Sequence, residues 1–294
     1  MFDDVTVTFN NRSPLAVTDY KLVNDGDSVY VDYTINSAAQ DMYSITVERS
    51  AGSQNGIERT VINVTDNARR RSYSDVLKLK MQRDGKTSYR IYAMNQKGTY
   101  IGDGYKKVTI EVNPSYMIYA NRNIYLPDTA AKVLPAYFSL SDATSYSYTN
   151  GQANSAKIDF GIWRRPNPST TPQDVATNPY VYNLYSISAP TNPFPLYDVS
   201  AWTKRATKFS APQTSQTNTF LYNAVSASTI DALAKARNPG LTAINATNFA
   251  TGLSPGCTIC FLTPEGKYGI MLVNAITSDY ERRPYINVSV KIQR

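Results

Sequence analysis

Short segments in which apolar and polar residues alternate recur along the first 112 residues of the chain. "VTVTF" places Val5, Val7 and Phe9 on one face, and "SVYVDYTI" repeats the pattern from Val29. Successive side chains of a strand point to opposite faces, so a period of two predicts strands with one buried face. The same alternation continues in "MYSITVER", "TVINVT", "VLKLKMQ", "SYRIYAMN" and "KKVTIEV".

Turn signals separate these seven segments, in the stretches "NDGD", "GSQNG", "RDGK" and "NQKGTYIGDG". Seven short strands at this spacing, without a helical pattern between them, are typical of a sandwich. The sequence therefore predicts an immunoglobulin-like or fibronectin-like β-sandwich over residues 1–112. Pro114 follows this segment and favours a break in the chain there.

The remaining residues, 113–294, predict a second and larger β-sandwich-type domain, because 294 residues exceed one usual domain. Strand patterns include "AYFSLS", "SYSYT", "KIDFGIW", a hairpin in "CTICFLTPEGKYGIMLVNAI" and the closing "PYINVSVKIQR". One short helix is expected near 229–237, ended by Asn238-Pro239-Gly240. Proline and asparagine crowd residues 164–200 and indicate long loops with one or two short strands. The predicted fold class is all-β.

The residue types present exclude several chemistries. The chain has no histidine, which removes histidine triads, histidine metal ligands and histidine proton shuttles. Its two cysteines, Cys257 and Cys260, form a C-x-x-C motif that can indicate redox chemistry. The flanking residues read as a strand, on which positions i and i+3 face opposite ways. We therefore predict two buried, unpaired thiols, and we expect no metal and no cofactor.

Positive charge is uneven along the chain, which carries a net charge of +7. Residues 1–112 hold 15 Lys and Arg against 14 Asp and Glu, whereas residues 113–294 hold 15 against 9. The tight basic run, Arg69 to Arg71, is interpreted as a solvated loop, so no nucleic-acid partner is expected. No apolar run approaches the roughly 20 residues that a membrane-spanning helix needs.

Both tryptophans and the long proline-rich connections fall in the more basic second part. Aromatic rings can stack on sugar rings, and arginine can orient a ligand, so this region carries the candidate ligand site. The alternative is that the same rings pack in a core. The candidate residues are Trp163, Arg164, Arg165, Tyr180, Tyr182 and Trp202.

The order of motifs in residues 135–294 resembles a module of secreted lipoproteins from gut Bacteroides-type bacteria. The resemblance rests on "NSAKIDFGIW", "AWTKRATKF", the helix "TIDALAKA", "GKYGIMLV" and "VSVKIQ". It covers strand and turn patterns without a catalytic motif, and an immunoglobulin-like module precedes it. The resemblance implies export to the periplasm or the outer-membrane surface. It also implies a lipidated N-terminal cysteine, which this sequence lacks.

Three functions remain open. We expect a non-catalytic exported protein that binds glycan or another surface protein, and not an enzyme. A purely structural or assembly module is the first alternative. The second is a carboxylate-dependent glycoside hydrolase, for which two carboxylates suffice and Asp159 is the best single candidate.

Overall fold

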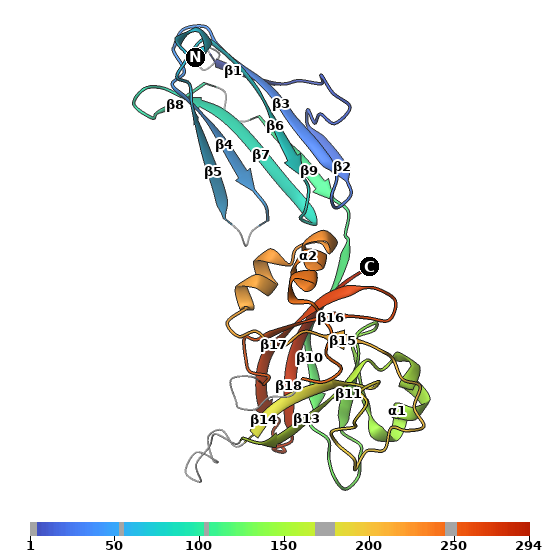
Figure 1. Cartoon of the computed structure of the whole chain (residues 1–294). Helices are drawn as coiled ribbons and strands as arrows, with labels where there is room; N and C mark the ends of the chain where they lie inside the picture. The colour runs from blue at the N-terminus through green and yellow to red at the C-terminus, as the bar shows by residue number, and fades with distance from the viewer. Residues whose placement is uncertain (1–4, 53–55, 103–105, 168–179, 245–251) are drawn as a thin grey trace. The chain divides into compact units, whose positions relative to one another are not determined.

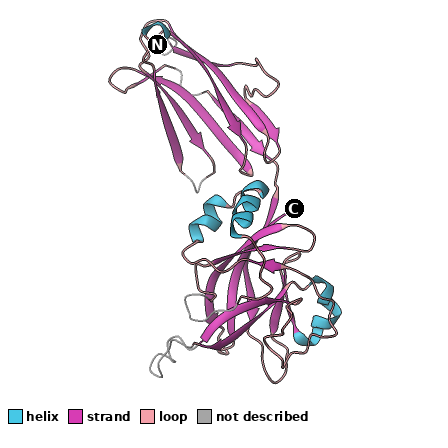
Figure 2. Cartoon of the chain, viewed as in Figure 1, coloured by secondary structure: helices cyan, strands magenta, loops and turns pink. Residues whose placement is uncertain are grey.

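The computed structural model describes residues 5–52, 56–102, 106–167, 180–244 and 252–294 (Figure 1). The chain divides into two compact units, Met1–Ser115 and Tyr116–Arg294. The boundary predicted at 112–113 lies just before this division. Strands dominate both units, so the predicted all-β, sandwich-type class is confirmed (Figure 2).

Two sheets form the first unit. The smaller sheet is antiparallel and contains, in order, β1 (Val5–Phe9), β3 (Ser28–Ser37) and β6 (Ser72–Lys80). The larger sheet contains, in order, β2 (Tyr20–Val23), β9 (Lys107–Val112), β7 (Gly85–Met94), β4 (Ser44–Ser50) and β5 (Ile57–Asn63). The short strand β8 (Tyr100–Ile101) pairs with β7, and the 3₁₀ turn η1 spans Asn67–Arg69.

Every second residue of strands such as β1, β3 and β9 is buried in the core of the first unit. Val5, Val7, Val31 and Tyr33 are buried in one cluster, as the period-two pattern predicts. All seven predicted strands are present. β2 and β8 were not predicted, because β2 is short with an exposed Tyr20 and β8 lies inside a segment that reads as a turn.

The second unit also has two sheets with a core between them. The first contains, in order, β10 (Tyr116–Tyr125), β18 (Pro284–Gln293), β17 (Tyr268–Ser278), β16 (Thr258–Leu262) and β15 (Lys208–Phe209). The second contains, in order, β12 (Thr144–Ser147), β11 (Pro135–Ser139), β13 (Phe160–Pro166) and β14 (Tyr180–Ser186). Residues of both sheets, such as Phe138, Phe160, Met271 and Val290, are buried in one cluster.

Helices cover the outer face of the β10–β18–β17–β16–β15 sheet at one end. The predicted helix is present as α2 (Ala227–Arg237), which Ser226 caps and Asn238 ends in a left-handed conformation. Together with the π-helical turn η3 (Thr219–Asn223), it packs on Cys260, Ile270 and Leu272.

A second short helix, α1 (Tyr148–Asn154), is followed by the 3₁₀ turn η2 (Ser155–Lys157). The sequence predicts strand structure into Thr149, but the strand ends at Ser147 and the chain turns helical. Gly151 explains the tight packing here, because a Cβ at this position would lie 2.2 Å from the Trp202 ring. Only glycine allows α1 to approach that ring so closely.

The long loops predicted over 164–200 are shorter in the structure. β13 continues through Pro166, and β14 occupies 180–186, while 168–179 lie outside the described residues. Pro166 is tolerated because β11 pairs with β13 only at Phe160 and Gly161, so Pro166 has a partner strand on one side alone among the described residues. Irregular chain remains between Ile187 and Thr207.

The two cysteines are free and buried, as predicted. Cys257 belongs to the core between the sheets, and Cys260 belongs to the cluster under α2, so the thiols leave opposite faces. Burial raises the pKa of the Cys260 thiol to about 11, which keeps it protonated near neutral pH.

A buried lysine on β18 holds η3 against the sheet. The Lys291 ammonium donates to the carbonyls of Phe220, at 2.6 Å, and Ala224, at 2.7 Å. It also lies 4.7 Å from the centroid of the Phe220 ring. This ammonium therefore satisfies two carbonyl oxygens that helix geometry leaves free.

We predict that Lys291→Met lowers the free energy of unfolding by about 1–3 kcal/mol, because two buried carbonyls lose their donor. Urea unfolding of both proteins measures the change. Lys235→Met is the control, since its ammonium pairs with Asp231 at the surface and such pairs contribute little. Equal stability of the two variants would contradict the role of Lys291.

Candidate functional site

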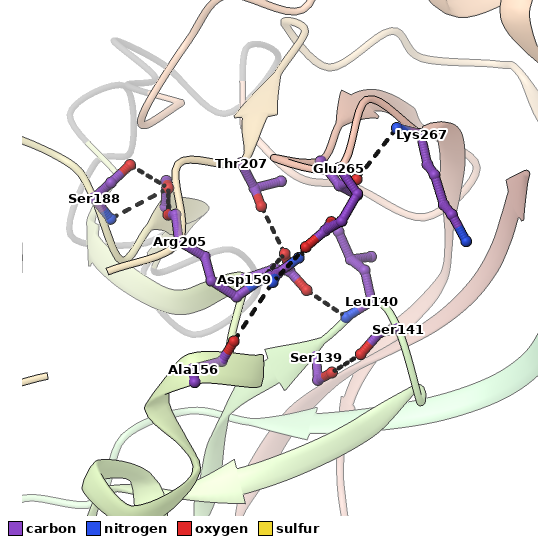
Figure 3. A network of polar contacts seen from close by, with 12 residues as sticks. Ser139, Leu140, Ser141, Ala156, Asp159, Ser188, Arg205, Thr207, Glu265 and Lys267 are labelled. Carbon is purple, nitrogen blue, oxygen red and sulfur yellow. Dashed lines mark hydrogen bonds and ion pairs between the residues drawn. The ribbon is translucent and has the colours of Figure 1, made fainter. Parts of the chain in front are cut away.

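Asp159 lies directly before β13 and is the centre of a buried polar network (Figure 3). Its carboxylate accepts a hydrogen bond of 2.6 Å from the Thr207 hydroxyl and one of 2.7 Å from the backbone N–H of Leu140. Arg205 Nε donates a third, at 2.9 Å. Both oxygens of this fully buried carboxylate are therefore engaged.

Arg205 also reaches across to the turn between β16 and β17. Its two terminal nitrogens each donate to one oxygen of Glu265 at 2.8 Å, in a bidentate pair. One of them additionally contacts the Ala156 carbonyl at 3.5 Å. The guanidinium thus joins the β13 side of the unit to the opposite sheet.

The two carboxylates in this network have different environments. Burial raises the pKa of Asp159, although the hydrogen bonds from Thr207, Leu140 and Arg205 oppose that shift. The bond from Arg205 lowers the pKa of Glu265 to about 2, against a smaller opposing effect of burial. In glycosidases, the two catalytic carboxyl groups have different pKa values because their environments shift them in opposite directions. Here Asp159 has no surface left for a substrate, so its contacts favour a structural role.

Acid should weaken this network in a defined pH window. Because the folded-state pKa of Glu265 is lowered, its carboxylate adds stability above the ordinary value of about 4.3, and this stability is lost as pH falls toward about 2. Denaturant unfolding at several pH values should show wild type exceeding Glu265→Gln at pH 6, with a gap that shrinks between pH 5 and 2. A gap that stays constant over this range would contradict the assignment.

Five of the six predicted ligand residues lie on the paired strands β13 and β14, and three of these five share one face. Arg164 is opposite Tyr182 in the strand register, and Pro166 is opposite Tyr180. The Arg164 guanidinium carbon lies 3.8 Å from the centroid of the Tyr180 ring, a cation–π contact. Arg164, Tyr180 and Tyr182 therefore share one face of the hairpin.

Trp163 and Arg165 alternate with Arg164 and lie on the opposite face. Trp163 is half-buried and packs against the cluster of Tyr137, Tyr185 and Trp202. In the part of the chain that the structure describes, the Trp163 indole nitrogen and two Arg165 nitrogens are buried without a hydrogen-bond partner. The predicted site is thus divided between the two faces of the sheet, and Tyr182 and Trp163 pack against different apolar clusters.

Trp202 belongs to the core, which corrects its assignment to a ligand surface. Its side chain is 5% exposed, and its ring centroid lies 4.7 Å from Tyr137 and 5.8 Å from Tyr148. The close approach of Gly151 leaves no space over the ring for a ligand. The sequence shows that both tryptophans lie in a proline-rich region, but it does not show that Trp202 is buried. The burial of Trp202 depends on its contacts with α1.

We predict that Trp202→Ala destabilises the second unit by about 3–5 kcal/mol, as large core truncations do. Thermal denaturation followed by circular dichroism should show a clear fall in Tm. Tyr280→Ala is the matched control, because that ring is 91% exposed and its loss removes no core contact. A Trp202→Ala protein as stable as this control would contradict the assignment of Trp202 to the core.

Sequence reasoning missed an open face on the β10–β18–β17 sheet. Tyr125 lies opposite Tyr285, and Asn123 lies opposite Asn287. The intervening residues, such as Ile124 and Ile286, are buried between the sheets. The two tyrosines and two asparagines must therefore point to the other side of the sheet.

Side-chain amides form a connected ladder across this face. Asn274 Nδ2 donates to Asn287 at 2.7 Å and to the Ser289 hydroxyl at 2.8 Å. Asn287 Nδ2 donates in turn to Asn123 at 2.6 Å, and Asn121 lies at the far end, 3.4 Å from Asn274. Asn121 has a φ of 55°, at an irregularity in the β10–β18 pairing.

Two tyrosine rings in a tilted arrangement lie next to the ladder. The centroids of Tyr125 and Tyr285 are 5.4 Å apart with an interplanar angle of 48°, and both rings are half-buried. The Arg283 guanidinium lies 5.8 Å from the Tyr125 ring and pairs with Asp279. We call the set Asn121, Asn123, Tyr125, Asn274, Tyr285 and Asn287 the amide–tyrosine face.

No helix among the described residues is long and apolar enough to cross a membrane. The same residues contain no group of three or more Cys, Asp or Glu side chains that could hold a metal ion.

Comparisons with known proteins add little. No family model and no curated protein matches the chain. A solved structure with some likeness is a β-glucosidase from Listeria innocua in complex with glucose, with 12% identity and a TM-score of 0.21. The match covers 38% of this chain and 16% of that one.

Proposed function

We propose that the chain is a non-catalytic glycan-binding protein and that the amide–tyrosine face binds the glycan. The observation that carries the proposal is the pair of adjacent tyrosines beside four asparagines on a solvent-facing sheet. Tyrosine rings present an apolar face and a polar tip, and both suit a sugar ring. Amides both donate and accept hydrogen bonds, as sugar hydroxyls do.

The chemistry of this face favours a neutral ligand. Its six residues carry no formal charge, in a chain whose net charge is +7. An acidic polymer would be better matched by lysine and arginine, whereas uncharged hydroxyls are matched by amides. The hydrogen bonds along the ladder hold the amides in fixed orientations before the ligand arrives. Such preorganisation lowers the entropy lost on binding.

The contacts of Asp159 support the non-catalytic part of the proposal. The carboxylate that best suits a hydrolase is fully buried and accepts bonds from three groups of the protein. An exported protein of the periplasm or outer-membrane surface would meet glycans routinely, and we keep that location as part of the proposal.

A glycan array of neutral oligosaccharides identifies the ligand, and calorimetry then compares variants against it. Tyr125→Ala and Tyr285→Ala should each weaken binding by roughly 30-fold if each ring contributes about 2 kcal/mol. The variants should remain folded, because loss of one ring from an aromatic pair costs about 0.5–1.5 kcal/mol beyond its burial.

Tyr222→Ala is the matched control, since this tyrosine of η3 is 41% exposed and lies outside the face. Its binding should equal that of wild type. Binding that survives both face variants, or that depends on Arg164 and Tyr180 instead, would contradict the proposal. An array without any neutral ligand would contradict it as well.

A further inference from the structure

A separate cavity of about 270 Å³ lies beside the Asp159–Arg205–Glu265 network. It is somewhat smaller than the roughly 300–1,000 Å³ of pockets for drug-sized ligands, so it suits a small molecule. Met117 and Ile292 give it an apolar wall, and Arg205 and Glu265 give it a polar one. Its lining shares no residue with the amide–tyrosine face.

Two lysines line this cavity without an anionic partner. Lys157 ends η2 and Lys267 lies in the β16–β17 turn, and neither ammonium forms an ion pair with a described residue. The carboxylate of Glu265 already forms a bidentate ion pair with Arg205. In Figure 3 the Lys267 side chain extends away from Glu265.

The charges around the cavity leave one positive charge uncompensated. Asp159, Arg205 and Glu265 together carry −1 when ionised, and the two lysines bring the total to +1. A ligand with a single negative charge would neutralise the net charge of these five side chains. In a partly enclosed pocket such an attraction is stronger than in bulk water.

We infer that this cavity binds a small organic monocarboxylate. The two carboxylate oxygens lie toward Lys157 and Lys267, one for each ammonium, and the body of the ligand lies on Met117 and Ile292. Arg205 forms part of the cavity wall and does not donate to the ligand carboxylate. Its N–H groups already donate to Asp159, Glu265 and Ala156. This site is independent of the proposed glycan site.

Calorimetry with sodium glucuronate tests the inference, with glucose as the uncharged probe of the same ring size. We expect glucuronate to bind and glucose not to bind, and added sodium chloride should weaken glucuronate binding. The double variant Lys157→Gln/Lys267→Gln should reduce glucuronate affinity at least tenfold. Lys204→Gln is the control, because Lys204 lines a different hollow and its loss should change nothing.

A further variant separates this inference from the glycan proposal. Tyr125→Ala/Tyr285→Ala should bind glucuronate as wild type does, since those rings lie outside the cavity. Absence of glucuronate binding, equal binding of glucose by the Tyr125→Ala/Tyr285→Ala variant, or full affinity in the double lysine variant would each overturn the inference. The thermal stability of the lysine variant, which breaks no ion pair among the described residues, should match that of wild type.

Discussion

The bidentate contact between Arg205 and Glu265, anchored by Asp159, links segments that the sequence keeps far apart. Asp159 precedes a strand of one sheet, and Glu265 lies in a turn of the other. A buried carboxylate costs free energy unless it is paired, and the arginine supplies that pairing. Removing one partner of a buried pair such as Asp159 and Arg205 typically costs about 3–5 kcal/mol, so the network adds to the apolar core that joins the two sheets.

The position of α2 decides which part of the outer sheet surface stays open. With η3 it packs on Ile270 and Leu272, and the buried Lys291 ties η3 to β18. Farther along the same face, Asn287 and Tyr285 contact neighbouring side chains of the sheet but remain partly exposed. A large apolar surface there would be unfavourable unless another element packed over it, whereas side-chain amides can hydrogen-bond with water. The polar ladder therefore lets a strand surface serve for binding.

Much of the fold could be predicted from local sequence. Period-two alternation identified the strands of the first unit, and capping residues identified α2. The strand reading around Cys257 and Cys260 also predicted that their thiols diverge. Each of these inferences needs only residues close together in the chain.

The candidate site could not be predicted in the same way, because it depends on pairing between distant strands. Tyr125 meets Tyr285, and Arg205 meets Glu265, only after the sheets form. The alternating pattern shows which face of β10 and of β18 is buried, but not that these two strands pair, so the tyrosine pair has no local signal. Trp202 was assigned to a surface for a related reason, since its burial follows from a glycine on α1.

A crystal structure of the chain with a neutral oligosaccharide selected on the array tests the central claim most directly. We predict that a sugar ring stacks on Tyr125 or Tyr285, with hydroxyls bonded to Asn123, Asn274 or Asn287. An oligosaccharide bound at the β13–β14 hairpin, away from this face, would contradict the account.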